Sequence, residues 1–333
     1  MKYREAAYYQ PIENEQVRCL LCPHRCVISS GKTGICGVRR NRAGRLLAET
    51  YGHCASFAVD PMEKKPLYHF HPGMLIFSVG SRGCNLSCRF CQNHSLAHGQ
   101  PDTHYLSPRD LVASVLSRAP ESIGIAFTYN EPLVSFEFLL EASAEAAQNN
   151  LKTVVVSNGY INNEPLQKLL PLVNAFNIDL KGYSQEYYQK FTGGKLEQVK
   201  RNIISAKNTG CHVEVTTLLI PGENDDPQEI ERMAAWLAAE AGRDVPLHLS
   251  RYFPAHKLDS PPTPLKTMEQ AYHAALKQLD FVYLGNAPEL DKSSTSCPRC
   301  NTLIISRSWG KVTIENLNED SCAVCGKELS IVS

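Results

Sequence analysis

Short apolar runs alternate with amphipathic stretches between residues 75 and 284. The runs are rich in Val, Ile, Leu and Phe and are bounded by turn residues, so they predict β-strands. These strands are Leu75–Val79, Ile123–Thr128, Thr153–Ser157, Phe176–Leu180, His212–Leu219, Leu247–Ser250 and Phe281–Leu284. Helical spacing of apolar residues predicts helices at Pro108–Leu116, Leu133–Gln148, Glu164–Leu170, Leu196–Asn208, Pro227–Ala239 and Met268–Gln278. Strands that alternate with helices of this length predict an α/β fold with a parallel sheet, which could form either a full or partial (β/α) barrel or an open sheet.

The two ends of the chain lack this alternation. Residues 1–72 have few long periodic runs and many turn residues, which predicts a small N-terminal cysteine-rich extension. We place the barrel at residues 73–291 and a C-terminal four-cysteine module at residues 292–333, after a polar linker. Within this module, Leu303–Ser306 and Lys311–Ile314 are expected to form a hairpin.

Composition narrows the functional classes. The 333 residues include 34 Lys and Arg and 34 Asp and Glu, and this zero net charge does not favour a nucleic-acid partner. We find no apolar run of about 18 residues, so no membrane-spanning helix is expected. The first residues, Met1-Lys2-Tyr3-Arg4-Glu5, lack the apolar core of a signal peptide, and we expect a cytoplasmic protein.

Cysteine is abundant and clustered. Eleven of the 13 cysteines fall into three groups, whereas Cys54 and Cys211 stand alone and are expected to be buried apolar fillers. The groups are Cys19, Cys22, Cys26 and Cys36; Cys84, Cys88 and Cys91; and Cys297, Cys300, Cys322 and Cys325. Because thiols stay reduced in the cytoplasm, such groups indicate metal sites or catalysis rather than disulfides.

The central group directly follows a predicted strand. Cys84, Cys88 and Cys91 offer three thiolates, so a 4Fe–4S cluster held by them keeps one iron open for a ligand. Phe90 could cover such a cluster and exclude water. The alternatives are a redox pair or a zinc knuckle that borrows His94 or His98.

The two flanking groups are less specific. The two Cys-x2-Cys pairs in the C-terminal module predict a zinc ribbon, with rubredoxin-type iron or an auxiliary iron–sulfur cluster as alternatives. The N-terminal four cysteines could bind zinc or an iron–sulfur cluster, or stay as unliganded thiols.

The spacing Cys-x3-Cys-x2-Cys, with an aromatic residue before the last cysteine, resembles the hallmark of the radical S-adenosylmethionine (SAM) superfamily. That resemblance implies a 4Fe–4S cluster whose open iron binds SAM. Reductive cleavage would then give methionine and a 5′-deoxyadenosyl radical that abstracts hydrogen from a substrate. It also implies flavodoxin or ferredoxin as the electron donor.

Further motifs at the ends of the predicted strands match the same superfamily. Thr128-Tyr129-Asn130-Glu131-Pro132 looks like its Gly-Gly-Glu motif, Ser157-Asn158-Gly159 resembles its Thr-Asn-Gly, and Asp179-Leu180-Lys181 is similar to the Asp-Leu-Lys of glycyl-radical-enzyme activases. His248 would lie near the adenine. The residues expected to bind SAM are therefore Phe90, Asn130, Glu131, Ser157, Asn158, Asp179, Lys181 and His248.

Over nearly its full length the chain looks like the AmmeMemoRadiSam-system radical SAM enzymes, relatives of pyruvate formate-lyase activating enzyme. The features that match include Cys19-Leu20-Leu21-Cys22-Pro23-His24-Arg25-Cys26 and the segment Asp60–Phe70. The resemblance implies AMMECR-like and Memo-like protein partners and hydrogen abstraction from a protein residue, or otherwise from a small molecule. The competing hypothesis is a metal-binding scaffold without turnover.

Overall fold

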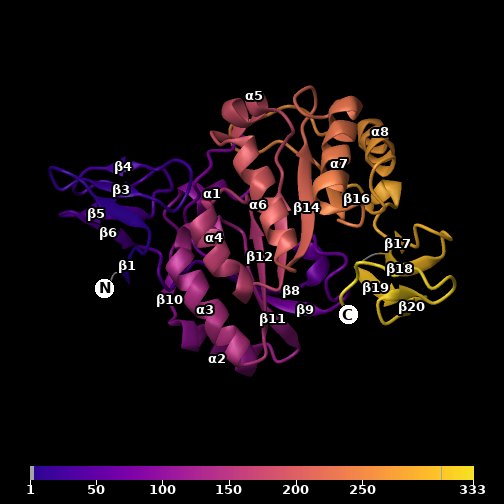
Figure 1. The fold of residues 1–333 in the computed structure, drawn as a ribbon, viewed down its shortest axis with the longest axis horizontal. Coiled ribbons are helices and arrows are strands. Elements are labelled where there is room, and N and C mark those ends of the chain that lie inside the picture. The colour runs from indigo at the N-terminus through magenta and orange to yellow at the C-terminus, as the bar shows by residue number, and fades with distance from the viewer. Residues whose placement is uncertain (1–3, 309) are drawn as a thin grey trace.

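A computed structural model describes residues 4–308 and 310–333. The N-terminal residues considered for a signal peptide therefore lie partly outside the described chain. The protein has three parts along its long axis (Figure 1): a cysteine-rich N-terminal part, a central sheet with its helices, and a small C-terminal module.

The centre is an eight-stranded sheet. Its order is β16 (Val282–Gly285), β15 (Leu247–Arg251), β14 (His212–Leu219), β13 (Ala175–Asp179), β12 (Lys152–Ser157), β11 (Ser122–Phe127), β9 (Leu75–Gly80) and β8 (Ser56–Pro61). All neighbours are parallel except β8, which runs antiparallel to β9. The seven predicted strands are confirmed. Among the described residues, β16 and β8 are the two edge strands of this sheet.

The predicted helices are also present, with small shifts at their ends. They are α2 (Pro108–Arg118), α3 (Phe136–Gln148), α4 (Asn163–Leu169), α6 (Leu196–Asn208), α7 (Pro227–Ala241) and α8 (Leu265–Leu276). In Figure 1 the helices α2, α3, α4, α6 and α7 lie together on one side of the strands. A sheet whose strands follow one another in chain order, with its crossover helices on one side, is the arrangement of (β/α) barrels.

The segment after β8 packs against the central sheet. It contains the short helix η1 (Met62–Lys64) and continues to Pro72. Its buried side chains Met62, Leu67 and Phe70 form a separate apolar cluster with residues near the starts of the strands, among them Ile76 and Ala175. The strand β8 lies before residue 73, the predicted start of the barrel, yet it pairs with β9 over its full length.

The N-terminal part consists of very short antiparallel strands that the sequence pattern did not predict. One sheet has the order β1 (Arg4–Glu5), β6 (Arg45–Ala48), β5 (Arg39–Arg42), and another joins β2 (Tyr9–Pro11), β3 (Val17–Cys19) and β4 (Val27–Ile28). Strand β7 (His53–Cys54) pairs with β10 (His104–Tyr105). Cys54 is 1% exposed and Cys211 is 7% exposed, so both are the buried fillers expected.

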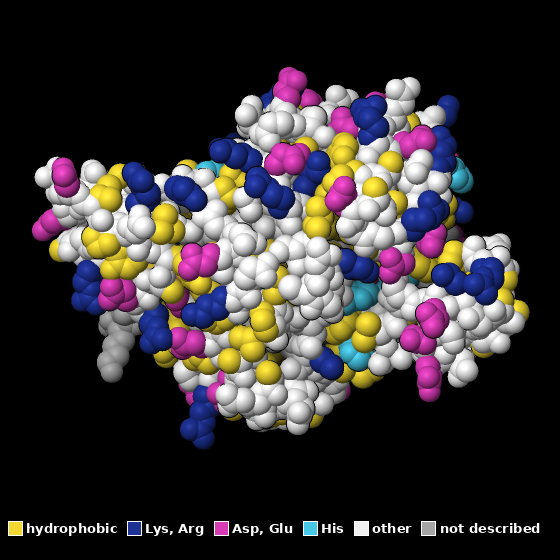
Figure 2. Space-filling model, viewed as in Figure 1, with side chains coloured by type: hydrophobic (Ala, Val, Ile, Leu, Met, Phe, Trp, Pro, Cys, Tyr) yellow, Lys and Arg dark blue, Asp and Glu magenta, His cyan; other side chains and the backbone are white. Residues whose placement is uncertain are grey.

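The C-terminal module contains the predicted hairpin, formed by β18 (Leu303–Ser308) and β19 (Lys311–Ile314), with β17 (Thr295–Ser296) beside it. A small apolar cluster that includes Ile304 and Ile305 packs against Phe281 and Tyr283 of the sheet edge. On the face shown in Figure 2, basic and acidic side chains are interspersed, as the zero net charge suggests. In the part of the chain described, no helix combines the length and the apolar character needed to cross a membrane.

Candidate functional site

The central cysteines lie in the loop between β9 and the short helix α1 (His94–His98). Gly83, just before Cys84, has a φ of +93°, a conformation that side chains other than glycine rarely adopt. A Cβ atom at Gly83 would lie 2.5 Å from Cγ1 of Val38 in the N-terminal part. Glycine is therefore required here both by the backbone turn and by the close approach of the N-terminal part.

A π-helical turn at Tyr188–Thr192 supports the other side of the cysteine loop. The backbone N–H of Ser87 donates to the carbonyl of Thr192 over 2.8 Å, and the N–H of Arg89 donates to the carbonyl of Phe191 over 3.0 Å. Such turns are rare and are frequently found at functional sites, where they place backbone groups that a regular helix would use internally. Sequence analysis did not predict this turn.

The buried carboxylate of Glu131 links the ends of two strands. Its Oε1 atom accepts hydrogen bonds from Oγ of Ser157 at 2.8 Å and from the N–H of Leu133 at 3.0 Å, and its Oε2 atom accepts from the N–H of Asn158 at 2.8 Å. Burial raises the pKa of Glu131 to about 7, although these hydrogen bonds favour the charged form. Three predicted SAM residues thus form one connected group.

Asn158 connects this group to the cysteine loop. Its side-chain amide donates to Sγ of Cys84 at 3.7 Å and to Oδ1 of Asn85 at 3.0 Å. Amide donors that face a thiolate stabilise its negative charge, which suits a residue beside a cysteine that binds metal.

Asn130 has a different environment. Its Oδ1 atom accepts from the N–H of Ser81, and its Nδ2 atom donates to the carbonyls of Arg82 and Gly83. The side chain therefore braces the backbone that leads into the cysteine loop. Its direct contact with SAM stays a prediction.

Asp179 and Lys181 lie beside Cys88. The Nζ atom of Lys181 donates to Oδ2 of Asp179 over 2.8 Å. Burial raises the pKa of the Cys88 thiol to about 12, while the positive charge of Lys181 acts in the opposite direction. Phe90, also predicted to cover this site, is buried against the ring of Tyr187 at a centroid distance of 6.5 Å.

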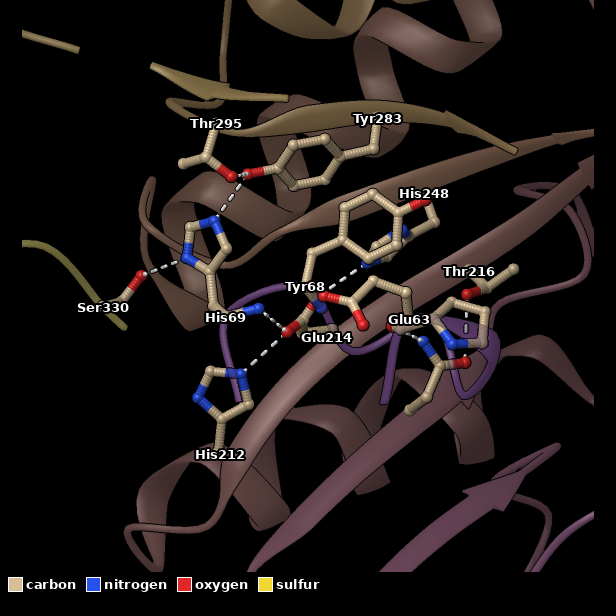
Figure 3. A network of polar contacts seen from close by, with 12 residues as sticks. Glu63, Tyr68, His69, His212, Glu214, Thr216, His248, Tyr283, Thr295 and Ser330 are labelled. Atoms are coloured by element: carbon tan, nitrogen blue, oxygen red, sulfur yellow. Dashed lines mark hydrogen bonds and ion pairs between the residues drawn. The ribbon is translucent and has the colours of Figure 1, made fainter. Parts of the chain in front are cut away.

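His248 belongs to another group of side chains (Figure 3). Its Nε2 atom lies 2.6 Å from Oε2 of Glu214, and its ring packs edge-on against Tyr68 at 4.7 Å. Because His248 is the second residue of β15, these contacts lie near the start of that strand, whereas the cysteine loop follows the end of β9. The described contacts of His248 are thus with this buried network, and its predicted place near adenine remains untested.

Glu214 is the centre of this network and was missed by sequence analysis. Its carboxylate accepts from the backbone N–H groups of Tyr68 and His69 at 2.9 and 2.7 Å, and it lies 3.0 Å from Nε2 of His212. Although burial alone would raise the pKa of Glu214, hydrogen bonds from His212 and His248 hold it well below its ordinary value. The sequence did contain one signal for this network, a Glu within the predicted strand His212–Leu219, because carboxylates are rarely buried unless they have partners.

Arg307 joins the C-terminal module to the same network. Its guanidinium donates to the carbonyl of Ser293 and the hydroxyl of Thr295, lies 3.3 Å from Oε1 of Glu63, and stacks over the ring of Tyr68 at 4.4 Å. The side chain is buried, so these contacts fix the module against the segment after β8.

The four C-terminal cysteines are arranged for one metal ion. All four Sγ atoms lie within 4.8 Å of one another, with Cys297–Cys325 at 3.6 Å and Cys300–Cys322 at 3.7 Å. A zinc ion binds thiolates at about 2.3 Å, which sets the edges of its sulfur tetrahedron at about 3.8 Å. The group can therefore hold a single tetrahedral ion.

The central cysteines have a wider spacing. Among the described residues, the C-terminal four are the one group of three or more Cys, His, Asp or Glu residues whose ligand atoms are this close together. A single zinc ion shared by Cys84, Cys88 and Cys91 would need similarly short distances, whereas a cubane attaches each thiolate to a different iron. The rings of His94 and His98 stack with His256 at 4.7 and 6.3 Å. The geometry thus fits an iron–sulfur cluster better than a zinc knuckle.

Comparisons with known proteins agree with this site. A family model described as the radical SAM superfamily matches residues 78–237. The "uncharacterized protein MJ0808" of Methanocaldococcus jannaschii is 40% identical, and the match covers 99% of each chain. The isethionate sulfite-lyase activating enzyme of Nitratidesulfovibrio vulgaris is 28% identical over 40% of this chain and 43% of its own length. The structure of a radical SAM methyltransferase from Sphaerobacter thermophilus is similar in fold, with a TM-score of 0.52, 16% identity, and coverage of 65% of this chain and 67% of that one.

Proposed function

Because the chain belongs to the radical SAM superfamily, we propose that it cleaves SAM reductively and directs the resulting 5′-deoxyadenosyl radical at a residue of a partner protein. The observation that carries this proposal is the convergence of polar side chains on one cysteine loop. Asn158, whose backbone N–H donates to Glu131, also donates its side-chain amide to Sγ of Cys84. Lys181 lies beside Cys88. These groups come from the ends of three successive parallel strands, where barrel enzymes build their active sites.

Cys84, Cys88 and Cys91 would hold the 4Fe–4S cluster. When bound, the cluster supplies one electron to the sulfonium of SAM and keeps one iron free of protein ligands. Glu131 in its charged form would accept hydrogen bonds from the ammonium group of SAM, as charged acceptors do most strongly. Lys181 and Asp179 would contact the remaining polar groups of SAM, and Phe90 would exclude water from the loop.

A protein substrate is favoured by the relationship to activating enzymes of glycyl radical enzymes. The matched region covers 38–43% of those activating enzymes, so their substrates are not transferred to this chain. We propose the same class of reaction, hydrogen abstraction from a backbone or side-chain position of a protein. Reduced flavodoxin or ferredoxin would be the electron donor, and the resemblance to AmmeMemoRadiSam enzymes adds AMMECR-like and Memo-like proteins as candidate partners.

The C-terminal module has a structural role in this proposal. We propose zinc as its ion, because four thiolates at tetrahedral spacing form a closed shell with no position for a substrate. A module of about 40 residues is too small for an independent core, so the ion would stabilise its fold.

The proposal is tested by product analysis. The protein is reconstituted with iron and sulfide without oxygen, mixed with SAM and dithionite, and assayed for 5′-deoxyadenosine and methionine. We expect both products in equal amounts from the wild type and none from Cys88→Ala. A wild type that contains the cluster but forms no 5′-deoxyadenosine would refute the proposal and favour a scaffold.

Cys211→Ala is the matched control for this assay. Cys211 is also a buried cysteine, but it lies just before β14, and its thiol contacts the carbonyl of His212. Its removal should leave product formation unchanged, which separates loss of a ligand from general loss of a thiol.

A further inference from the structure

The N-terminal cysteines share one cavity. Cys19, Cys22, Cys26 and Cys36 all line it. All four are free thiols, and they are drawn from both ends of the segment between β3 and β5. The cavity therefore offers four sulfur ligands around a space that the side chains do not fill.

The spacing of these sulfurs does not suit one metal ion. No three of the four Sγ atoms lie within 4.8 Å of one another, in contrast to the C-terminal group. A tetrahedral zinc would need all of its sulfur–sulfur distances near about 3.8 Å. A cubane carries its four thiolates on four different irons, so the sulfurs lie much farther apart.

A buried arginine with unused donors faces this cavity. Arg39 also lines it and is 1% exposed. One nitrogen, Nη2, donates to both carboxylate oxygens of Glu137 at 2.9 and 2.7 Å, whereas Nε and Nη1 have no hydrogen-bond partner. Leaving buried donors unpaired costs free energy, so their presence points to an acceptor that belongs in the cavity.

We propose that Cys19, Cys22, Cys26 and Cys36 hold a second 4Fe–4S cluster, with Arg39 donating to its sulfur atoms. A cubane with four thiolates carries a net negative charge, and its sulfides accept N–H hydrogen bonds, so it satisfies both the charge and the free donors of Arg39. This site goes beyond the proposed function, because it needs neither SAM nor a substrate.

The second site is fastened to the radical SAM loop. His24, which lies between Cys22 and Cys26, has its Nε2 atom 2.7 Å from the carbonyl oxygen of Asn85, the residue after Cys84. Asn162, at the start of α4, donates its side-chain amide to the carbonyl of Leu20 over 2.6 Å. The two cysteine loops are therefore in direct contact through His24.

The test counts iron, acid-labile sulfide and zinc per chain after reconstitution without oxygen. The deciding variant carries Cys84→Ala, Cys88→Ala and Cys91→Ala, which removes the radical SAM cluster and leaves the N-terminal part intact. We expect this variant to keep about four irons and about four sulfides. Adding Cys22→Ser and Cys26→Ser should remove them, and Cys54→Ser, a buried cysteine outside the groups, should remove none.

The acid-labile sulfide content distinguishes a cluster at this site from iron at the C-terminal site, because a single iron bound by four cysteines brings no inorganic sulfide. Mössbauer spectra of the triple variant should show a cubane. A triple variant with zinc in place of iron, or with no sulfide, would overturn the second cluster. Product formation from SAM is not measured here, so failure of this inference is distinct from failure of the proposed function. Because the deciding variant retains the N-terminal cysteines, the result does not depend on whether the Cys22→Ser, Cys26→Ser chain folds.

Discussion

The side-chain amide of Asn158 donates to Sγ of Cys84 over 3.7 Å, while the same side chain holds Asn85 in place. Hydrogen bonds to sulfur stabilise the charge that a cluster gains on reduction, so they raise its reduction potential. We expect Asn158→Ala to make the cluster at Cys84 harder to reduce. A redox titration followed by electron paramagnetic resonance should give a more negative midpoint potential.

Asn149→Ala is the control for this titration. Asn149 lies at the exposed end of α3, where its amide donates to the carbonyl of Glu145. An unchanged midpoint in Asn158→Ala, with the cluster intact, would show that the Asn158 contact has no electrostatic effect on the cluster.

Glu131 is predicted to bind the ammonium group of SAM. In Glu131→Gln the charge is lost, and the new amide group faces the N–H donor of either Leu133 or Asn158, because these two donors bind different carboxylate oxygens. Hydrogen bonds to a charged group contribute about 1.5–3 kcal/mol, so the dissociation constant of SAM should rise about 10- to 100-fold. Calorimetric titration of the cluster-loaded protein measures this constant, and Glu145→Gln at a half-buried position of α3 provides the control. Equal affinities in wild type and Glu131→Gln would remove Glu131 from the SAM site.

Arg307 should be important for stability rather than for chemistry. Arg307→Ala leaves Glu63 and the carbonyl of Ser293 without their buried partner and removes the stack on Tyr68. Breaking a buried charged contact costs about 3 kcal/mol, so the free energy of unfolding should fall by roughly that amount. Denaturant titration measures the loss. Lys311→Ala, at an exposed position of the same module, should have little effect, and a stability change below about 0.5 kcal/mol in Arg307→Ala would contradict the docking role.

Asp60 should make stability depend on pH in the acid range. Burial would raise its pKa, but hydrogen bonds from Lys65, Ser78 and Tyr129 lower it from 3.8 to about 2. The stabilisation is therefore fully present above about pH 4 and is lost as the pH falls through about 2. The stability difference between wild type and Asp60→Asn should shrink over this window. Both proteins are measured in the same metal state, so that acid effects on metal binding cancel. A difference that stays constant from pH 5 to pH 2 would contradict this assignment.

The sequence predicted the strands of the central sheet well because each is a short segment rich in apolar and β-branched residues. His212–Leu219 and Leu196–Asn208 were predicted with the bounds that the structure has. The N-terminal strands of two to four residues were not predicted, since so short a segment cannot show a periodic pattern.

The candidate site was partly predictable. Cys84, Glu131, Asn158 and Lys181 come from separate strand ends, and the parallel order of the sheet brings them to one edge. The Glu214 network was not predictable in the same way, because its members lie between Glu63 and Ser330 in the chain and follow no motif. Spacing along the chain also could not reveal the distances between the N-terminal sulfurs, which depend on how the loop folds.

The segment Met62–Pro72 has a consequence for access. Its side chains pack on the strand starts through Leu67 and Phe70, and Glu214 fastens its backbone at Tyr68 and His69. The protein's own chain thus covers the starts of these strands. Under the proposed function, a partner protein would therefore present the reacting atom from the side of the strand ends that carry Glu131 and Lys181.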